Sequence, residues 1–166
     1  RRQICAVGNP VQRFEEDALR ILRGVRFAAQ LGFDIEAETK EAMVKLAPDI
    51  AKISAERIQT ELVKLITSAH PGEIRTAWET GLTAVFLPEF DRMMATPQNT
   101  KHHCYSVGEH TVAALEHIVG DKVLRLTMLC MMWQNLCAEP RMLPAMTIFT
   151  DIPKKAVRWQ ERSSAG

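Results

Sequence analysis

The chain has 166 residues, of which 46% are hydrophobic and 25% are charged, and its formal net charge is +1. A chain of this length and composition can bury a real core in one or two small domains, and its near-neutral charge neither requires nor excludes a nucleic-acid partner. Its four cysteines form no paired metal-binding spacing, and no apolar run reaches the roughly 18 residues of a membrane span, so we expect a cytoplasmic protein with no membrane partner.

The first predicted element is an amphipathic helix that ends near Gly32. Its apolar residues recur at the spacing of one buried helix face, and they are Phe14, Ala18, Ile21, Val25 and Ala28. Asn9 is a good N-cap, Pro10 suits the first turn, and Gly32 stands where a left-handed C-terminal cap belongs. We therefore predict one helix across this whole segment.

A polar stripe lies one position before each of these apolar residues, and it consists of Arg13, Asp17, Arg20 and Gly24. Spacing alone favours an exposed face on which Asp17 and Arg20 form an i, i+3 ion pair that contributes roughly 0.2–0.5 kcal/mol. The alternative is recognition of a base, because a carboxylate only accepts hydrogen bonds and a guanidinium only donates them. Such a pair would accept cytosine or adenine, which carry an amino donor beside a ring-nitrogen acceptor, and reject uracil and guanine. Gly24 would leave room for the base or for another chain segment.

A dense motif extends through this helix and the turn before it. It reads Val7-Gly8-Asn9-Pro10, then Arg13-Phe14-x-Glu16-Asp17-x-x-Arg20-x-x-Arg23-x-x-Arg26-Phe27-x-x-x-Leu31-x-Phe33. This motif closely resembles the start of the neck region in bacterial CCA-adding tRNA nucleotidyltransferases and their poly(A) polymerase relatives. In that family the Glu-Asp-x-x-Arg motif selects incoming CTP and ATP. The resemblance implies this role for Glu16, Asp17 and Arg20: Asp17 would accept from the amino group of the base, Arg20 would donate to the ring nitrogen, and Arg13 and Glu16 would help to orient them.

Three other features belong to the same resemblance. Arg23 and Arg26 are candidate RNA-binding residues within the motif. The family usually carries a basic residue where this chain has Cys5, so the role of that side chain is not carried over. The chain does not begin with Met, and its first seven residues read as the end of an earlier segment. We therefore expect a fragment of a longer enzyme.

Further helices are predicted as far as residue 66. A short helix around Ala42–Ala47 has Thr39 as a possible cap and is stopped by Pro48. The next has Ser54 as its cap and an apolar face made of Ile58, Leu62, Leu65 and Ile66. The segment Ile53-Ser54-Ala55-Glu56-Arg57-Ile58-x-x-Glu61-Leu62-x-Lys64-Leu65 resembles a second landmark of the neck domain. We expect Glu56, Arg57 and Glu61 to lie on a solvated face.

Two more short helices, one ending at Gly81 and one before Pro88, complete a run of helices without any alternating strand pattern. The fold class predicted for the chain is therefore all-α, with residues 1–90 as a helical neck domain. The stretch from Glu89 to Lys101 is polar, contains Pro97 and lacks periodicity. We predict that residues 91–101 are an interdomain connector.

Residues 102–129 contain a further helical segment in which His110 and His117 share a face with Ala114. Spacing alone is typical of satisfied surface or half-buried histidines. The stretch from Asn99 to Thr111, however, resembles the first motif of an HD-type metal-dependent phosphohydrolase domain. The resemblance implies that His110 is the first ligand of a divalent metal, which a later His-Asp pair and a downstream aspartate would complete. We predict a truncated HD-type domain here, and an incomplete site, because His110 alone does not hold a metal ion.

From residue 130 the resemblance stops. The family pattern leads one to expect Leu-Leu-His-Asp-Ile-Gly-Lys-Pro, but the chain reads Cys130-Met131-Met132-Trp133-Gln134-Asn135-Leu136. When the codons of this stretch are read one nucleotide earlier, they encode Asp-Val-Ala whichever synonymous codons are used, and they permit His directly before the Asp. The codons of Met146–Lys155, read in the same shifted frame, permit a sequence that resembles a second HD-domain segment. We hypothesise that residues 130–166 are an out-of-frame tail, which was not selected to pack. The alternative is a real but divergent tail, and an intact reading frame across codon 130 would establish it.

The resemblance implies a fragment of an enzyme that transfers nucleotides from CTP and ATP to the tRNA 3′ end. Its catalytic domain would lie outside this chain and would hold Mg²⁺ on paired carboxylates. We expect no turnover from this chain alone and no metal bound to it. The alternatives are a poly(A) polymerase fragment, an HD-domain phosphohydrolase with its own divalent metal, and a helical RNA-binding module without enzymatic activity.

Overall fold

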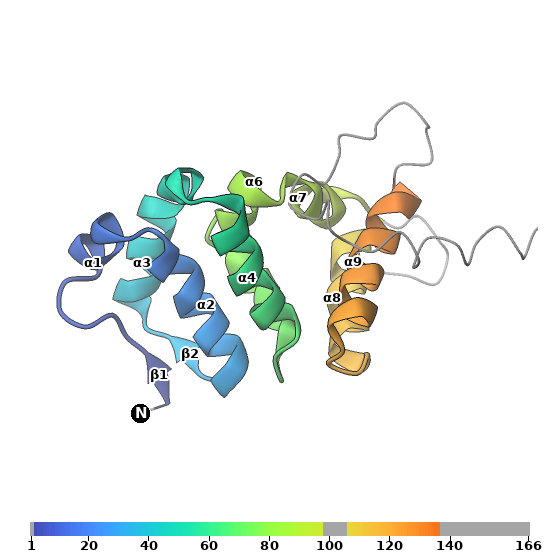
Figure 1. Ribbon diagram of the computed structural model, residues 1–166, viewed down its shortest axis with the longest axis horizontal. Coiled ribbons are helices and arrows are strands. Elements are labelled where there is room, and N and C mark those ends of the chain that lie inside the picture. Colours follow the sequence, from blue (N-terminus) through green and yellow to red (C-terminus); the bar gives the residue numbers. More distant parts are fainter. Residues whose placement is uncertain (1, 98–105, 137–166) are drawn as a thin grey trace, which may run out of the picture.

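The computed structural model describes residues 2–97 and 106–136, and these ranges are almost entirely helical (Figure 1). The first half consists of strand β1 (Gln3–Ile4), helices α1 (Pro10–Glu16) and α2 (Leu19–Leu31), strand β2 (Asp34–Ile35), helix α3 (Ala37–Leu46), 3₁₀ helix η1 (Ala47–Lys52) and helix α4 (Ala55–Ile66). The second half consists of 3₁₀ helix η2 (Pro71–Glu73) and helices α5 (Ile74–Glu79), α6 (Leu82–Phe86), α7 (Pro88–Ala95), α8 (Val107–His117) and α9 (Lys122–Leu136). The all-α prediction is confirmed.

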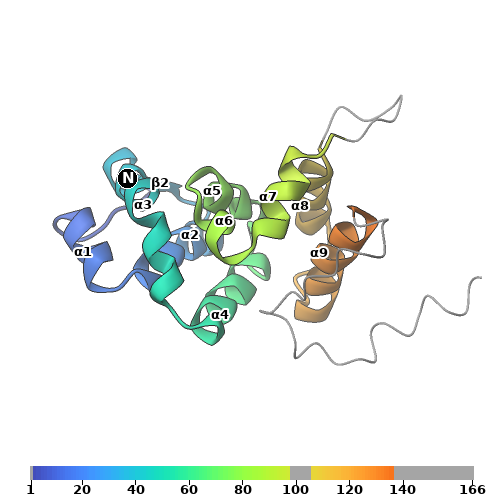
Figure 2. The same ribbon diagram turned by 90° about the horizontal axis from the view of Figure 1, so that it is seen from above.

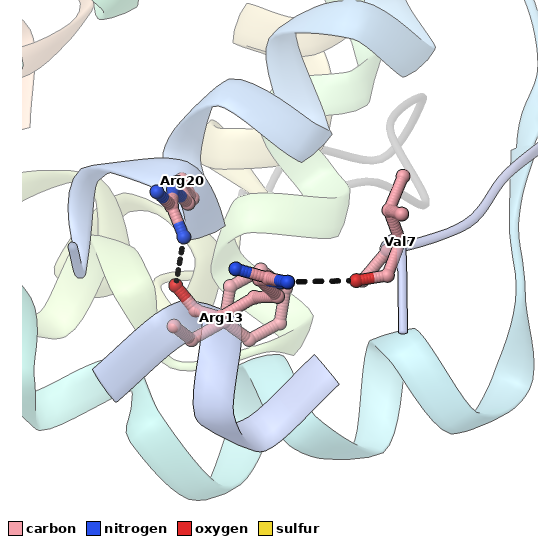
Figure 3. A pocket seen from close by; sticks show the side chains of 5 residues that line it. Val7, Arg13 and Arg20 are labelled. Atoms are coloured by element: carbon pink, nitrogen blue, oxygen red, sulfur yellow. Dashed lines mark hydrogen bonds between the residues drawn. The ribbon is translucent and has the colours of Figure 1, made fainter. Parts of the chain in front are cut away.

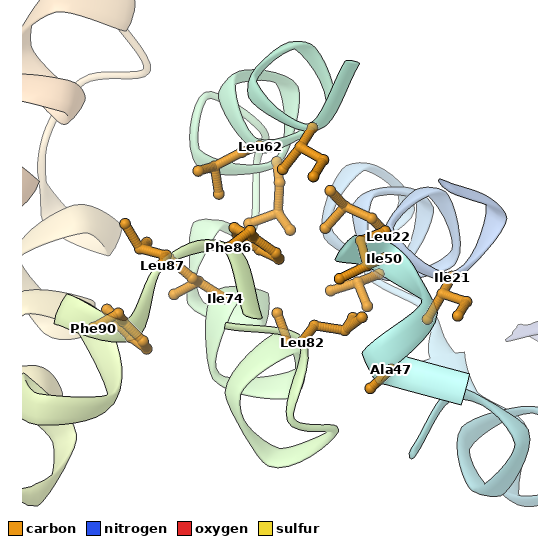
Figure 4. Packing of buried hydrophobic residues seen from close by; sticks show 14 of the residues in the cluster. Ile21, Leu22, Ala47, Ile50, Leu62, Ile74, Leu82, Phe86, Leu87 and Phe90 are labelled. Carbon is orange, nitrogen blue, oxygen red and sulfur yellow. The ribbon is translucent and has the colours of Figure 1, made fainter. Parts of the chain in front are cut away.

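The helices form an elongated array with α1 and α3 at one end and α8 and α9 at the other (Figures 1 and 2). Helix α2 packs along α4, and α7 packs against α8. Between the ends, side chains from α2, η1, α4, α5 and α6 meet in one apolar core (Figure 4). Its fully buried members include Leu22, Ile50, Leu62, Ile74 and Leu82. Strands β1 and β2 form a short parallel pair in which Gln3 lies opposite Asp34.

The predicted caps of the first helical segment are confirmed, but its continuity is not. The Asn9 side chain accepts a hydrogen bond from the Gln12 N–H, and Gly32 adopts the left-handed conformation with φ 64°. Between them the helix breaks at Asp17, whose φ of −153° and ψ of 102° are extended. Asp17 Oδ1 instead accepts a hydrogen bond from the Leu19 N–H at 3.1 Å. An Asp side chain that binds nearby backbone in this way favours a helix end over a helix interior.

Two other predicted caps behave differently. Thr39 lies inside α3, where its hydroxyl accepts from the Ala6 N–H at 3.2 Å and donates to the Glu36 carboxylate at 3.0 Å. Thr39 therefore ties the N-terminal segment to α3. The prediction that it caps a helix is wrong. Ser54 does stand at the N-cap position of α4, but its side chain makes no capping hydrogen bond.

The residues directly after Pro88, although their sequence lacks periodicity, are helical. Residues 88–95 form α7, which begins with Pro88 at its first position and buries Phe90, Met93 and Met94. Proline suits this position because its missing N–H would have no helical partner there. Of the predicted 91–101 connector, residues 91–95 lie in α7, residues 96 and 97 follow it, and residues 98–101 lie outside the described ranges.

Arg125 of α9 joins the ends of two earlier helices. Its guanidinium is buried, which lowers the pKa of the group, and it donates to the carbonyl oxygens of Ile66 at 2.5 Å and Ser68 at 2.8 Å, near the end of α4. It also donates to the carbonyl of Ile118, the C-cap residue of α8, at 2.9 Å. The last carbonyls of a helix lack helical partners and carry a partial negative charge, so one cation stabilises both helix ends. Within the described ranges, no helix combines the length and apolar character that crossing a membrane requires.

Replacing this cation should therefore destabilise the fold. Arg125→Met keeps much of the side-chain length but leaves the buried Ile66 carbonyl and the partly buried Ser68 and Ile118 carbonyls without their charged donor, so we expect a loss of about 3 kcal/mol in the free energy of unfolding. Urea denaturation followed by circular dichroism measures it. Lys122→Met, at an exposed position of the same helix, is the control and should change little. Equal stability of the two variants would contradict the stabilising role of Arg125 at the two helix ends.

Candidate nucleotide-recognition site

An open pocket of about 290 Å³ lies at the corner between the N-terminal segment and the start of α2 (Figure 3). It is lined by Ala6, Val7, Arg13, Phe14 and Arg20. Two of the four residues predicted to recognise a nucleotide, Arg13 and Arg20, therefore line one cavity, together with three apolar side chains. A cavity with an apolar wall and guanidinium donors suits a flat, polar-edged ligand.

A network of hydrogen bonds holds the two arginines. Arg13 Nε donates to the Val7 carbonyl at 3.2 Å, and Arg20 Nη1 donates to the Arg13 carbonyl at 3.0 Å (Figure 3). Both side chains also bind Glu16, with distances of 3.1 Å from Arg13 Nη1 and 2.5 Å from Arg20 Nη1. Hydrogen bonds from Arg20 and then Arg13 lower the pKa of the Glu16 carboxyl. Glu16 thus orients Arg20 from the side of α1.

Within the described residues, Asp17 and Arg20 do not form an ion pair with each other. Arg20 pairs with Glu16, whereas Asp17 Oδ2 accepts from Arg57 Nη2 of α4 at 3.2 Å. The helix break explains the difference, because Asp17 lies outside both α1 and α2 and does not share a helix face with Arg20. The i, i+3 ion pair predicted from spacing is therefore wrong.

Gly24, the last residue of the predicted polar stripe, is buried in the structure. A Cβ atom at this position would lie 2.5 Å from the Met43 Cε atom of α3. Gly24 was predicted to leave room either for a base or for another chain segment. In the structure the space beside Gly24 is occupied by another chain segment, α3. Gly24 does not line the pocket beside Arg20.

Glu61 contradicts the predicted solvated face most clearly, because it is buried between α2 and α4. Its carboxylate lies 2.5 Å from Arg26 Nε, 3.6 Å from Arg23 Nε and 3.5 Å from Lys64 Nζ. The sequence held a signal for this burial, since Glu61 falls three residues after Ile58 and four before Leu65, on the apolar face of α4. No spacing rule connects Arg57 to Asp17, which are 40 residues apart.

The two candidate RNA contacts differ in availability. Arg26 is nearly buried: it binds Glu61, donates to the Gln30 side chain at 2.5 Å and lies 3.9 Å from the centre of the Phe27 ring. Arg23 is about half exposed and has a longer contact with Glu61. Arg26 therefore has a structural task, whereas the Arg23 side chain remains accessible to solvent.

His110 is the fourth residue of α8, which begins at Val107 and is capped by the Ser106 hydroxyl. Among the residues that the structure describes, no group of three or more His, Cys, Asp or Glu side chains is placed to hold a metal ion. The described residues by themselves therefore do not form a complete metal centre. Cys5, where the family usually has a basic residue, is exposed.

Comparisons with known proteins agree on one family. Residues 32–94 match a family model described as the probable RNA and SrmB-binding site of polymerase A. The chain is 51% identical over 70 residues to the CCA-adding enzyme of Leuconostoc mesenteroides, covering 42% of this chain and 18% of that protein. It is 50% identical over 84 residues to the CCA-adding enzyme of Streptococcus pyogenes serotype M5, covering 51% of this chain and 19% of that protein. The matches thus span about a fifth of the curated relatives.

A solved structure extends the likeness over a larger share of the chain. The crystal structure of the Bacillus stearothermophilus CCA-adding enzyme in complex with CTP is similar over 81% of this chain and 31% of that chain, with a TM-score of 0.59 and 29% identity. The fold is helical, and its matched segment resembles the probable RNA-binding site of polymerase A. In sequence and in fold, the chain is similar to the neck domain of the CCA-adding enzyme and poly(A) polymerase family.

The buried carboxylate at the α2–α4 contact should matter for stability. Glu61→Gln removes the charge that Arg26 faces and leaves a nearly buried guanidinium uncompensated, so we expect a loss of about 3 kcal/mol in the free energy of unfolding. Glu16→Gln is the matched control at an exposed position and should be nearly neutral. Thermal unfolding of both variants at pH 7 tests the expectation. If Glu16→Gln proved the more destabilising of the two, the pairing described here would be wrong.

Proposed function

We propose that this chain is the nucleotide-selecting and RNA-binding part of a CCA-adding tRNA nucleotidyltransferase. The observation that carries the proposal is the pocket in which Arg20, of the Glu-Asp-x-x-Arg motif, lies beside the apolar side chains of Val7 and Phe14. The relatives named CCA-adding enzymes and the neighbour solved with CTP support the same substrate class. Transfer to the tRNA 3′ end, and the Mg²⁺ it requires, would be the work of a catalytic domain outside the described residues.

The proposed recognition uses complementary hydrogen bonds. The face of the base packs on the apolar wall of the pocket, Arg20 donates to the unprotonated ring nitrogen, and Asp17 accepts from the neighbouring amino group. Cytosine and adenine offer this pattern of acceptor and donor, whereas uracil and guanine offer the reverse. A site built to hydrogen-bond a group discriminates strongly against ligands that leave its polar groups unpaired. Glu16 and Arg13 would act by orienting Arg20.

The same geometry supports different roles for Arg23 and Arg26 in binding RNA. Arg23 is half exposed and would neutralise a phosphate of the tRNA acceptor end. We propose Arg26 as a residue that fixes α2 through Glu61, so that it supports the RNA-binding surface without itself binding a phosphate.

The domain division is also a proposal. Helices α8 and α9 would be the start of an HD-type domain, with His110 as the residue that matches its first metal ligand. In the structure α8 packs on η2 and α7, and Arg75 of α5 forms an ion pair with Glu109. Residues 137–166, most of the predicted out-of-frame tail, lie outside the described ranges. A poly(A) polymerase fragment remains the second candidate, because the matched family model names polymerase A.

Removing the Arg20 guanidinium should abolish base selection. The wild-type chain is expected to bind CTP and ATP about tenfold more tightly than UTP, the ratio that one hydrogen bond to a charged group supplies. Arg20→Ala should bring the affinities for CTP and UTP close together, because the donor to the ring nitrogen is gone. NMR titrations of the chain with each nucleotide measure this ratio. Lys52→Ala, a highly exposed cation paired only locally with Asp49, is the control and should keep the preference.

A second expectation concerns tRNA. Arg23→Ala should weaken tRNA binding at every salt concentration and reduce the slope of log K against log salt by about 1, the change that one lost phosphate contact produces. Lys52→Ala again serves as the control for loss of one positive charge. Fluorescence anisotropy with labelled tRNA between low and physiological salt gives both quantities. An unchanged slope in Arg23→Ala would remove this residue from the proposed contact.

A further inference from the structure

The Asp17 carboxylate is held from two sides. Oδ1 accepts from the Leu19 N–H at 3.1 Å, and Oδ2 accepts from Arg57 Nη2 at 3.2 Å. The first bond comes from the beginning of α2 and the second from α4, a different part of the chain. The Asp17 side chain is one quarter exposed, so part of the carboxylate still faces solvent.

Two bonds to different oxygen atoms fix the orientation of a carboxylate. One bond alone would leave the group free to rotate about its Cβ–Cγ bond, whereas two donors in different directions define its plane. An ionised carboxylate accepts about four hydrogen bonds, so each oxygen keeps a lone pair for an external donor. Asp17 is therefore oriented and still able to accept.

The partners also keep Asp17 and Arg20 from neutralising each other. A direct pair between them would satisfy both groups internally and would compete with any ligand for the same donors and acceptors. In the structure the Asp17 carboxylate is bound by Arg57 and the Arg20 guanidinium is bound by Glu16. Each group thus has an ion-pair partner other than its counterpart in the proposed base recognition.

We infer that Arg57 is a positioning residue for base selection, which orients the Asp17 carboxylate toward the amino group of cytosine or adenine. This inference rests on the proposed function of Asp17 and Arg20. Arginine suits the task because its guanidinium presents donors in a rigid plane, whereas a lysine ammonium is a flexible point charge. The selecting site accordingly includes α4 as well as the Glu-Asp-x-x-Arg segment.

The test uses the full chain and two uncharged ligands, cytidine and uridine, so that a change in protein charge does not alter long-range attraction. NMR titration gives the two dissociation constants and also follows the Leu19 amide signal, which reports on the hydrogen bond to Asp17 Oδ1. The variants are Arg57→Gln and Arg57→Lys. Lys64→Gln is the matched control, because Lys64 lies on the same helix and its side chain is 50% exposed, as is that of Arg57.

The wild-type chain should prefer cytidine about tenfold, and Arg57→Gln should reduce the preference to about twofold or less while shifting the Leu19 amide signal. Arg57→Lys should lie between the two, and Lys64→Gln should match the wild type in both readouts. If Arg57→Gln does not fold, Arg57→Lys decides the matter by a preference below that of the wild type.

The possible failures are distinct. If Arg20→Ala removes the wild-type preference for cytidine and the Arg57 variants retain it in full, the role of Arg57 is overturned and the proposed function is left intact. A wild-type chain that binds cytidine and uridine equally overturns the proposed function, and the inference with it. A weaker preference accompanied by an unmoved Leu19 amide also overturns the inference, because the carboxylate would then have kept its orientation.

Discussion

The contact between α2 and α4 depends on a buried carboxylate. Glu61 lies among apolar side chains of α4, where an unpaired charge would be costly, and Arg26 of α2 compensates it. An apolar contact tolerates sliding, but this pair permits only one register of the two helices. Arg57 lies one turn before Glu61 on α4, so the same register brings Arg57 to Asp17. The geometry of the candidate site is thus set by a charge buried outside it.

Features of the fold that depend on neighbouring residues could be predicted from the sequence. The Asn9 cap, the left-handed Gly32 and the buried face through Phe14, Ile21 and Val25 all follow from local backbone chemistry and helix periodicity. The break at Asp17 escaped this reasoning because the apolar spacing continues across it: Phe14 and Ala18 are both buried although one lies in α1 and the other precedes α2.

The candidate site was predictable in composition but not in pairing. The motif contains Arg13, Glu16, Asp17 and Arg20. In the structure Arg13 and Arg20 line one pocket and Glu16 pairs with both, whereas Asp17 pairs with Arg57. Which acid meets which base depends on the path of the backbone at Asp17 and on α4, which arrives from 40 residues further on. The helix after Pro88 was missed for another reason: eight residues give too few turns for a periodic pattern, and this helix packs against α6 and α8.

The close approach of α3 to Gly24 links the evolution of two positions. A side chain at position 24 and the end of the side chain at position 43 would occupy the same space, because an added Cβ atom lies 2.5 Å from Met43 Cε. Met43 has a flexible side chain that can turn away from one added methyl group, but not from a larger addition. Among related neck domains, residue volume at these two positions should vary in opposite directions, so that a larger residue at one accompanies a smaller residue at the other.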